Sequence, residues 1–196
     1  MSESHKPEEA TSERILKATI RLAAEKGYAN IPMRDIAVAA DVVLSQITYH
    51  FGSKEKLLIA AIRFVKSEYL KRLELGLKEL STTDERIKYA IDFFRNVIRN
   101  DIPISRLLLD FFNLAMWSEQ YRAEYRSLFD DLSAFLGHYI IRDDTLSPGS
   151  AAFTPEQVAR LVIGVTFGMS MQHTVDNTNK GILNALDMVG TLLEHK

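Results

Sequence analysis

Residues 33–58, MRDIAVAADVVLSQITYHFGSKEKLL, constrain the fold of this chain more than any other segment. Apolar residues recur there at three- to four-residue spacing, which predicts a short helix with one buried face. These residues are Ile36, Ala37, Ala40 and Val43. Asp41 favours a turn, because its side chain can hydrogen-bond to its own backbone. A second short helix is expected from Leu44 to Phe51, where Gly52 can end it.

This second helix carries polar side chains around two apolar anchors. Ile47 and Phe51 are four residues apart and are expected to pack inward. The remaining side chains can hydrogen-bond to the edges of base pairs: Ser45, Gln46, Thr48, Tyr49 and His50. Two helices joined by a tight turn form the helix-turn-helix arrangement, in which the second helix enters the major groove of DNA. The segment therefore predicts a DNA-reading helix.

Two basic residues within residues 33–58, Lys54 and Arg34, suggest an anionic partner. Ser53 is expected to cap the next helix, and Lys54 lies in its first turn, where a lysine opposes the helix dipole. A phosphate group would be attracted both by this lysine and by the backbone N–H groups of the helix end. Arg34 is a second candidate for a phosphate contact, with a solvated surface arginine as the alternative.

Three separated segments, in the right order, resemble the amino-terminal DNA-binding domain of TetR/AcrR-family transcriptional regulators. They are ERILKATIRLAAEKGY, MRDIA and ITYHFGSKEKLL. The resemblance implies an all-α fold, in which an amino-terminal three-helix helix-turn-helix domain is joined by a long helix to a helical ligand-binding and dimerisation domain, with about nine helices in all. The expected division is a flexible tail at 1–10, the helix-turn-helix domain at 11–54 and the effector-binding and dimerisation domain at 55–196.

The resemblance also implies which residues contact a double-stranded DNA operator. The candidates are Arg34, Leu44, Ser45, Gln46, Thr48, Tyr49, His50 and Lys54. Lys54 and Tyr49 are expected at phosphates, while Gln46, Ser45 and Thr48 are expected at base edges. The chain departs from the family pattern at Val43, Leu44 and Thr48, where polar or aromatic groups are usual. A helical ligand-binding dimer with weak or lost DNA binding is therefore the alternative function.

Composition limits the remaining possibilities. A chain of 196 residues with 46% hydrophobic content can form one substantial core or two small ones. The net charge of −2 means that any nucleic-acid site must be a local patch. Cysteine is absent, which excludes disulfides and thiolate ligands and fits a reducing cytoplasm. The polar segment 1–10 lacks the apolar core of a signal peptide, and the apolar run 161–175 is too short to span a bilayer, so no membrane partner is expected.

Local signals place the remaining helices. A continuous helix is expected from Lys54 to about residue 78, and Thr82 with Glu85 has capping-box spacing before a helix that runs to about residue 100. Another helix is expected from 119 to about 142, followed by a loop at 143–153. Thr154, Pro155 and Gln157 mark the clearest helix start in the chain, and two last helices are expected at about 155–175 and 180–195.

Large apolar side chains of the second half suggest a small-molecule pocket, although ordinary core packing is the alternative for each of them. The candidates are Phe93, Phe94, Phe111, Phe112, Met116, Trp117, Phe167, Met169 and His173, of which Trp117, Phe112 and His173 are preferred. The family resemblance implies that an effector pocket exists in this domain.

The last two helices are apolar on more than one face, which suggests a partner surface. Gly164 and Gly168 would allow close approach of another helix, from a partner or within one subunit. The family resemblance favours a homodimeric four-helix bundle. The candidate interface residues are Val158, Leu161, Val162, Val165, Gly168, Ile182, Leu186, Val189 and Leu193.

Enzymatic signatures were not found. The sequence contains no phosphate-binding glycine loop, HExxH helix or GxSxG elbow, and its five histidines are dispersed. We therefore expect no metal, no cofactor and no enzyme activity; an enzyme on a helical scaffold would need clustered ionisable groups in the pocket. The function expected is a repressor that a small apolar or amphipathic ligand releases from a palindromic operator.

Overall fold

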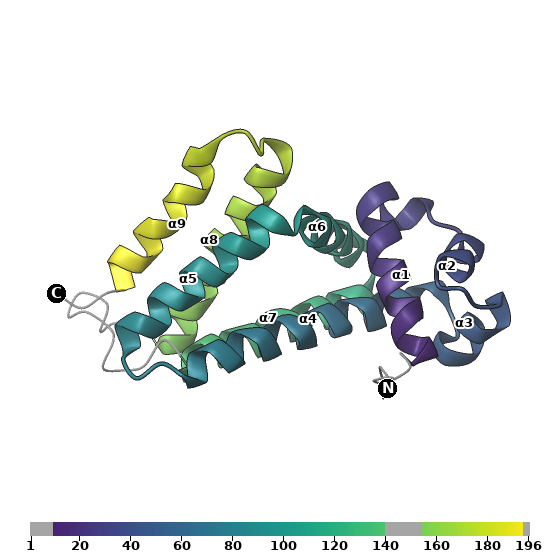
Figure 1. The fold of residues 1–196 in the computed structure, drawn as a ribbon, viewed down its shortest axis with the longest axis horizontal. Helices are drawn as coiled ribbons and strands as arrows, with labels where there is room; N and C mark the ends of the chain where they lie inside the picture. Colours follow the sequence, from purple (N-terminus) through teal and green to yellow (C-terminus); the bar gives the residue numbers. More distant parts are fainter. Residues whose placement is uncertain (1–9, 140–153, 194–196) are drawn as a thin grey trace, which may run out of the picture.

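The computed structural model describes residues 10–139 and 154–193, and within these ranges the chain forms nine α-helices, one 3-10 turn and no strand (Figure 1). The elements are α1 Thr11–Lys26, η1 Tyr28–Asn30, α2 Met33–Ala39, α3 Leu44–Phe51, α4 Lys54–Lys78, α5 Thr83–Asn100, α6 Ile102–Trp117, α7 Glu119–Tyr139, α8 Pro155–Val175 and α9 Lys180–Leu193. The predicted all-α class is confirmed. The expected tail, the loop at 143–153 and the last residues of two predicted helices lie outside the described residues.

Helices α1, α2 and α3 form a head at one end of the molecule (Figure 1). Its core includes Ile15, Ile36 and Ile47, each with no exposed surface. Helix α1 begins at Thr11 after Ala10, which supplies no side-chain cap. The same apolar cluster continues into α4 and α6, which shows that the head packs directly on the body.

The turn between α2 and α3 depends on one unusual backbone conformation. Asp41 has φ of 52°, in the left-handed region that Asp tolerates better than most residues. This turn places Val43 immediately before α3, with 63% of its surface exposed. The prediction that Val43 shares the buried face of Ile36 was therefore wrong, because the helical period does not continue through Asp41. The predicted bounds of α3 and the inward position of Ile47 are confirmed.

Helix α4 runs for 25 residues without interruption and extends from the head along the body (Figure 1). Ser53 Oγ accepts the N–H of Lys56 at 3.3 Å, as a capping residue does. Near the other end, α4 approaches α5 so closely that a Cβ atom added at Gly76 would collide with the ring of Tyr89. Only glycine therefore fits this crossing without a rearrangement.

The starts of α5 and α8 confirm the two predicted capping boxes. Thr82 and Glu85 exchange side chain to backbone hydrogen bonds of 3.0 and 3.2 Å, and Thr154 and Gln157 exchange bonds of 2.9 and 3.2 Å. Two further apolar clusters lie in the body. One joins α4, α5, α7 and α8, and the other joins α5 to α9. Within the described ranges, none of the helices has the length and apolar composition that a bilayer crossing requires.

Candidate functional site

The solvent side of α3 carries the predicted DNA-reading residues. Ser45, Gln46, Thr48, Tyr49 and His50 are all exposed, and Tyr49 exposes 83% of its surface. Leu44 is also exposed, at 39%, and so is Arg34 at the start of α2. Fully buried Ile47 holds the helix to the head from the opposite side. The structure therefore places the polar side of α3 outward.

Lys54 lies in a more restricted position than the other candidates. Its Nζ donates a hydrogen bond to the carbonyl of Ala29 at 3.2 Å and lies 4.9 Å from the centroid of the Tyr28 ring. Burial lowers the pKa of Lys54, although the neighbouring Glu55 opposes this shift. The Tyr28 hydroxyl in turn donates to the Lys54 carbonyl, and burial raises the pKa of Tyr28 far above its usual value. Lys54 is therefore held at the junction of η1 and α4, with further ammonium donors left for an anion.

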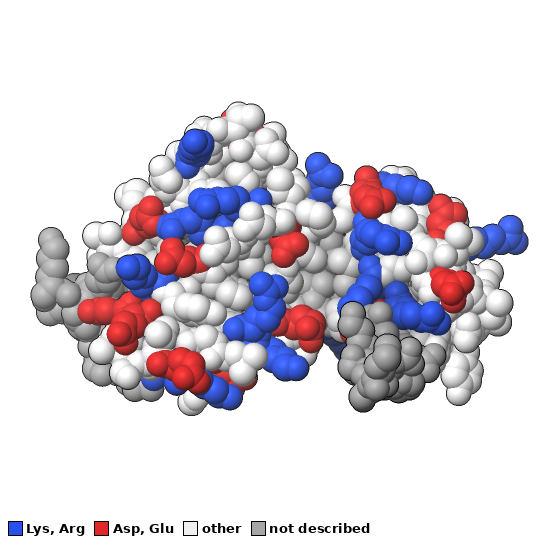
Figure 2. Space-filling view, in the orientation of Figure 1, with Lys and Arg blue, Asp and Glu red and all other residues white. Residues whose placement is uncertain are grey.

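The charge of the head differs in sign from that of the chain. Residues 11–56, the head together with the first turn of α4, contain seven Lys and Arg against five Asp and Glu, a net charge of +2, whereas the whole chain carries −2. Figure 2 shows that basic and acidic side chains are interspersed on the face in view. The head thus has a modest local excess of positive charge, as expected for a local patch rather than a global one.

The body encloses an apolar cavity of about 160 Å³. This is similar to an engineered cavity of about 150 Å³ that stays dry and binds benzene. The cavity lies among α4, α5, α6, α7 and α8, and its walls are mostly aliphatic and aromatic. Such a lining selects for an apolar ligand, because a polar group inside it would lose its hydrogen bonds to water.

Three of the nine predicted pocket residues line this cavity: Phe93, Phe94 and Phe167. Phe112 is not part of the lining but stacks behind it, with its ring centroid 6.0 Å from that of Phe167. Phe111 is fully buried in the core shared with the head, and Met169 packs on the cluster between α5 and α9. Whether each of these side chains lines the cavity depends on which face of its helix the neighbouring helices cover.

The other three predicted pocket residues also lie outside the lining. Trp117 and Met116 end α6 with 84% and 55% of their surfaces exposed. His173 is buried in α8, and its Nδ1 has no hydrogen-bond partner among the described atoms. The structure therefore does not bring the preferred trio of Trp117, Phe112 and His173 together at the cavity.

The polar groups at the cavity were missed from the sequence. Ser105 and Ser170 both line it, and the Ser170 hydroxyl donates to Ser105 Oγ at 2.8 Å. Tyr69 donates its hydroxyl hydrogen to the carboxylate of Asp101, and its pKa is raised first by burial and then by this bond. Burial raises the pKa of Tyr125 to about 12. In the sequence, these polar residues could have been found only from their helical spacing relative to apolar neighbours.

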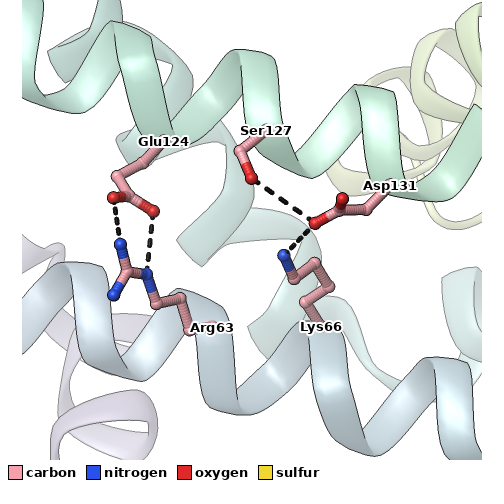
Figure 3. Close-up of polar contacts among 5 residues, drawn as sticks. All are labelled: Arg63, Lys66, Glu124, Ser127 and Asp131. Atoms are coloured by element: carbon pink, nitrogen blue, oxygen red, sulfur yellow. Dashed lines mark hydrogen bonds and ion pairs between the residues drawn. The ribbon is translucent and has the colours of Figure 1, made fainter.

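Two ion pairs join α4 to α7 (Figure 3). Arg63 makes a two-pronged contact with Glu124, and Lys66 pairs with Asp131. The hydroxyl of Ser127 also donates to Asp131, at 3.4 Å. Lys66 contributes to the lining as well, so its charge is anchored at the edge of the apolar space.

Helix α6 contacts both the cavity and the head. Ile104, Ser105 and Leu108 line the cavity, while Leu107 and Phe111 are buried in the core shared with the head. Asp110 accepts the backbone N–H of Tyr28 at 2.7 Å, at the start of η1. A displacement of α6 would therefore act on both sites.

The predicted interface residues of α8 and α9 divide into buried and exposed groups. Val158 and Leu186 are buried within the protomer, and Val162 lines the cavity. Val165, Gly168, Ile182 and Val189 are partly buried, and the side chain of Leu193 lies outside the described residues. Leu161 exposes 68% of its surface, and it begins a row at heptad spacing with Gly164, Gly168, Met171 and Val175. A Cβ atom at Gly164 or Gly168 would meet nothing within 4 Å.

Comparisons with known proteins agree with this arrangement. The family described as "Bacterial regulatory proteins, tetR family" matches residues 15–61, which include α2 and α3. An uncharacterized HTH-type transcriptional regulator of Xanthobacter autotrophicus is 24% identical over 189 residues, covering 90% of this chain and 89% of its own. The fatty acid metabolism regulator protein of Bacillus subtilis is 28% identical over 87 residues, 44% of this chain and 45% of its own length.

A solved structure extends the likeness to the whole fold. The transcriptional regulator FadR from Bacillus subtilis, in complex with stearoyl-CoA, superposes with a TM-score of 0.76 at 17% identity, and the match covers 93% of this chain and 97% of that one. Within the described residues, no group of His, Asp and Glu side chains is arranged to hold a metal ion. Residues 15–61, the helix-turn-helix head and the start of α4, thus belong to the tetR family of bacterial regulatory proteins, and the whole chain shares the fold of a solved transcriptional regulator.

Proposed function

We propose that this regulator is a homodimeric repressor, which a ligand with a long apolar chain releases from a palindromic operator. The observation that carries the proposal is the double role of α6, which lines the cavity and also holds the start of η1 through Asp110. A ligand that favours a different position of α6 would change the position of the head. The function is regulatory and not catalytic, and the site of action is the cytoplasm, where bacterial DNA lies.

The proposed ligand is a fatty acyl chain, either free or as a thioester. Support comes from the lining, in which Phe93, Phe94 and Phe167 surround a space without an internal charge other than the paired Lys66 at its edge. FadR of Bacillus subtilis, which shares the fold, was crystallised with stearoyl-CoA. A cavity of about 160 Å³, similar in size to one that binds benzene, holds only part of a long chain, and the chain would gain about 0.8 kcal/mol for each methylene that it buries there.

The proposed DNA contacts follow the exposed side of α3. Tyr49 and Lys54 would contact phosphates, with Arg34 and His50 beside them, and Ser45, Gln46 and Thr48 would meet base edges. Each protomer of a dimer supplies one such helix, and the two would lie about 34 to 36 Å apart on a palindromic operator.

The proposed dimer forms through the exposed row of α8 that begins at Leu161, together with exposed Met188 of α9. The absence of side chains at Gly164 and Gly168 would let the partner helix approach closely. Leu161→Arg should give a monomer by sedimentation, because it places a charge in the interface. Leu75→Arg, at an exposed leucine of α4, is the matched control and should remain dimeric.

A gel-shift titration tests the whole proposal. The protein should bind DNA that flanks its own gene, and saturated acyl-CoA or free fatty acid should release it. Leu108→Trp fills the cavity and should leave DNA binding intact while abolishing release; Trp117→Ala, on the same helix but outside the lining, should behave like the wild type. Release that persists in Leu108→Trp would exclude the cavity as the ligand site. Absence of DNA binding would favour the alternative of a ligand-binding dimer.

A further inference from the structure

Val43, the residue that precedes α3, differs from the residues that usually cap a helix. Val43 occupies the capping position, with φ of −81° and ψ of 148°, where Ser, Thr, Asp or Asn normally supplies an oxygen. The valine side chain has no oxygen, so the N–H of Gln46 donates instead to the backbone carbonyl of Val43, at 2.9 Å. The return bond is present, because Gln46 Oε1 accepts the N–H of Val43 at 3.2 Å. Of the two side chain to backbone bonds in a capping box, only this one is therefore made.

This half cap limits what Gln46 can do in a DNA groove. A glutamine that reads adenine uses both its oxygen and its nitrogen, which face N6 and N7 of the base. The oxygen of Gln46 is already committed to the backbone of Val43, so a bidentate contact would require the cap to break. Gln46 is thus less suited to base reading than its exposed position suggests.

Apolar side chains occupy the adjacent surface. Val43 and Leu44 expose 63% and 39% of their surfaces and lie next to exposed Ser45 and Gln46. They are continuous with the side of α3 that is proposed to face DNA. Among the base-edge groups that the major groove presents, the apolar one is the C5-methyl group of thymine.

We propose that Val43 and Leu44 recognise thymine through its C5-methyl group and so determine part of the operator sequence. This inference rests on the proposed DNA-binding function. It assigns a role in base recognition to two residues that depart from the family pattern. Apolar residues at the start of α3 exclude water from the methyl group, whereas the same residues beside the N4 amino group of cytosine would leave a hydrogen-bond donor unpaired.

Replacing thymine by deoxyuracil tests the inference, because it removes the methyl group and keeps every hydrogen-bonding group. The operator is first obtained by selection from random duplex DNA, and each thymine of the half-site is then replaced in turn. The wild type should bind about fourfold more weakly at each contacted position, the loss expected for one buried methyl-sized group. Leu44→Asn and Val43→Asn should each lose this sensitivity at one position, because each replaces the apolar group that would cover the methyl group by a polar one.

Leu75→Asn, at an exposed leucine of α4 outside the proposed DNA contacts, is the matched control and should retain full sensitivity to deoxyuracil. Circular dichroism melting of each variant verifies that the head is folded. Equal affinity of the wild type for thymine and deoxyuracil operators at every position would overturn the inference while leaving the proposed function intact. Sensitivity that persists unchanged in both Leu44→Asn and Val43→Asn would also overturn it. Failure to select any DNA would overturn both proposals together.

Discussion

The starts of α3 and α5 have the same spacing of residues but different chemistry. At α5, Thr82 and Glu85 each accept a backbone N–H of the other, at 3.2 and 3.0 Å. At α3, Gln46 Oε1 accepts the N–H of Val43, whereas the N–H of Gln46 donates to the backbone carbonyl of Val43 at 2.9 Å, because the valine side chain has no acceptor. The start of α8 repeats the complete exchange seen at α5. The start of α3 therefore lacks the side-chain capping bond that the starts of α5 and α8 both make.

This difference shows where stability and recognition compete. Missing caps commonly cost about 0.5–2 kcal/mol, and such losses concentrate at functional surfaces. In α3 the missing bond coincides with an exposed apolar pair, Val43 and Leu44, whereas the capped starts of α5 and α8 carry no such pair. Helix α3 must therefore depend more on its buried anchor than on its end.

The largest effect is expected at Ile47, the buried residue that holds α3 to the head. Ile47→Ala should lower the free energy of unfolding by about 2–5 kcal/mol, because it removes a fully buried side chain and leaves a cavity. Urea denaturation measures this change. Tyr49→Ala, which alters a residue with 83% exposure, should stay within about 0.5 kcal/mol of the wild type. A loss at Ile47 no larger than that at Tyr49 would show that packing does not hold α3.

The next largest effect concerns the complete caps. Thr82→Ala should destabilise the protein by about 0.5–2 kcal/mol, because the N–H of Glu85 loses its acceptor. Val43→Ala loses no side-chain hydrogen bond and should change stability by about 0.5 kcal/mol or less. Thermal melting compares the two. Equal losses would contradict the contrast between the two helix starts.

A smaller gain is expected when a side-chain cap is supplied at the start of α3. Val43→Thr keeps the side-chain shape and offers a side-chain acceptor to the N–H of Gln46, which in the wild type donates to the Val43 carbonyl at 2.9 Å, so the protein should become more stable by at most about 1 kcal/mol. Val38→Thr is the matched control, because Val38 is 82% exposed but lies inside α2 rather than at a helix start. Equal stabilisation by both substitutions would mean that capping is not the cause.

The smallest effect is a local response to acid. Backbone N–H groups of Thr82 and Ser81 donate to the Glu85 carboxylate and lower its pKa below the usual 4.5. The stabilisation is therefore present above the usual pKa and is lost as the pH falls through the lowered one. Amide exchange at Thr82 should accelerate over that range, whereas Thr154, capped by an uncharged glutamine, should not respond. Acid sensitivity of both caps would contradict this assignment.

Local patterns were sufficient where neighbours in sequence decide the structure. The bounds of α3 followed from Leu44, Phe51 and Gly52, and the starts of α5 and α8 followed from residues three apart. Caps and helical periods depend on contacts within one turn, so they can be read before the fold is known.

Side chains whose environment depends on distant segments could not be placed in this way. Trp117 is apolar and at helical spacing, but it lies in the last turn of α6 where no described element covers it. Lys66 pairs with Asp131, which is 65 residues away, and reaches the cavity edge only because α4 and α7 run side by side. Helical spacing alone does not say which stripe faces solvent, a cavity or a core.

The uninterrupted course of α4 has a geometric consequence for any signal that passes along it. Its 25 residues correspond to a length of about 37 Å. A tilt of about 5° at the body end would displace the opposite end by about 3 Å, which equals the rise of about two helical residues. A lever of this kind converts small angles within the body into offsets large enough to take a reading helix out of register with its groove.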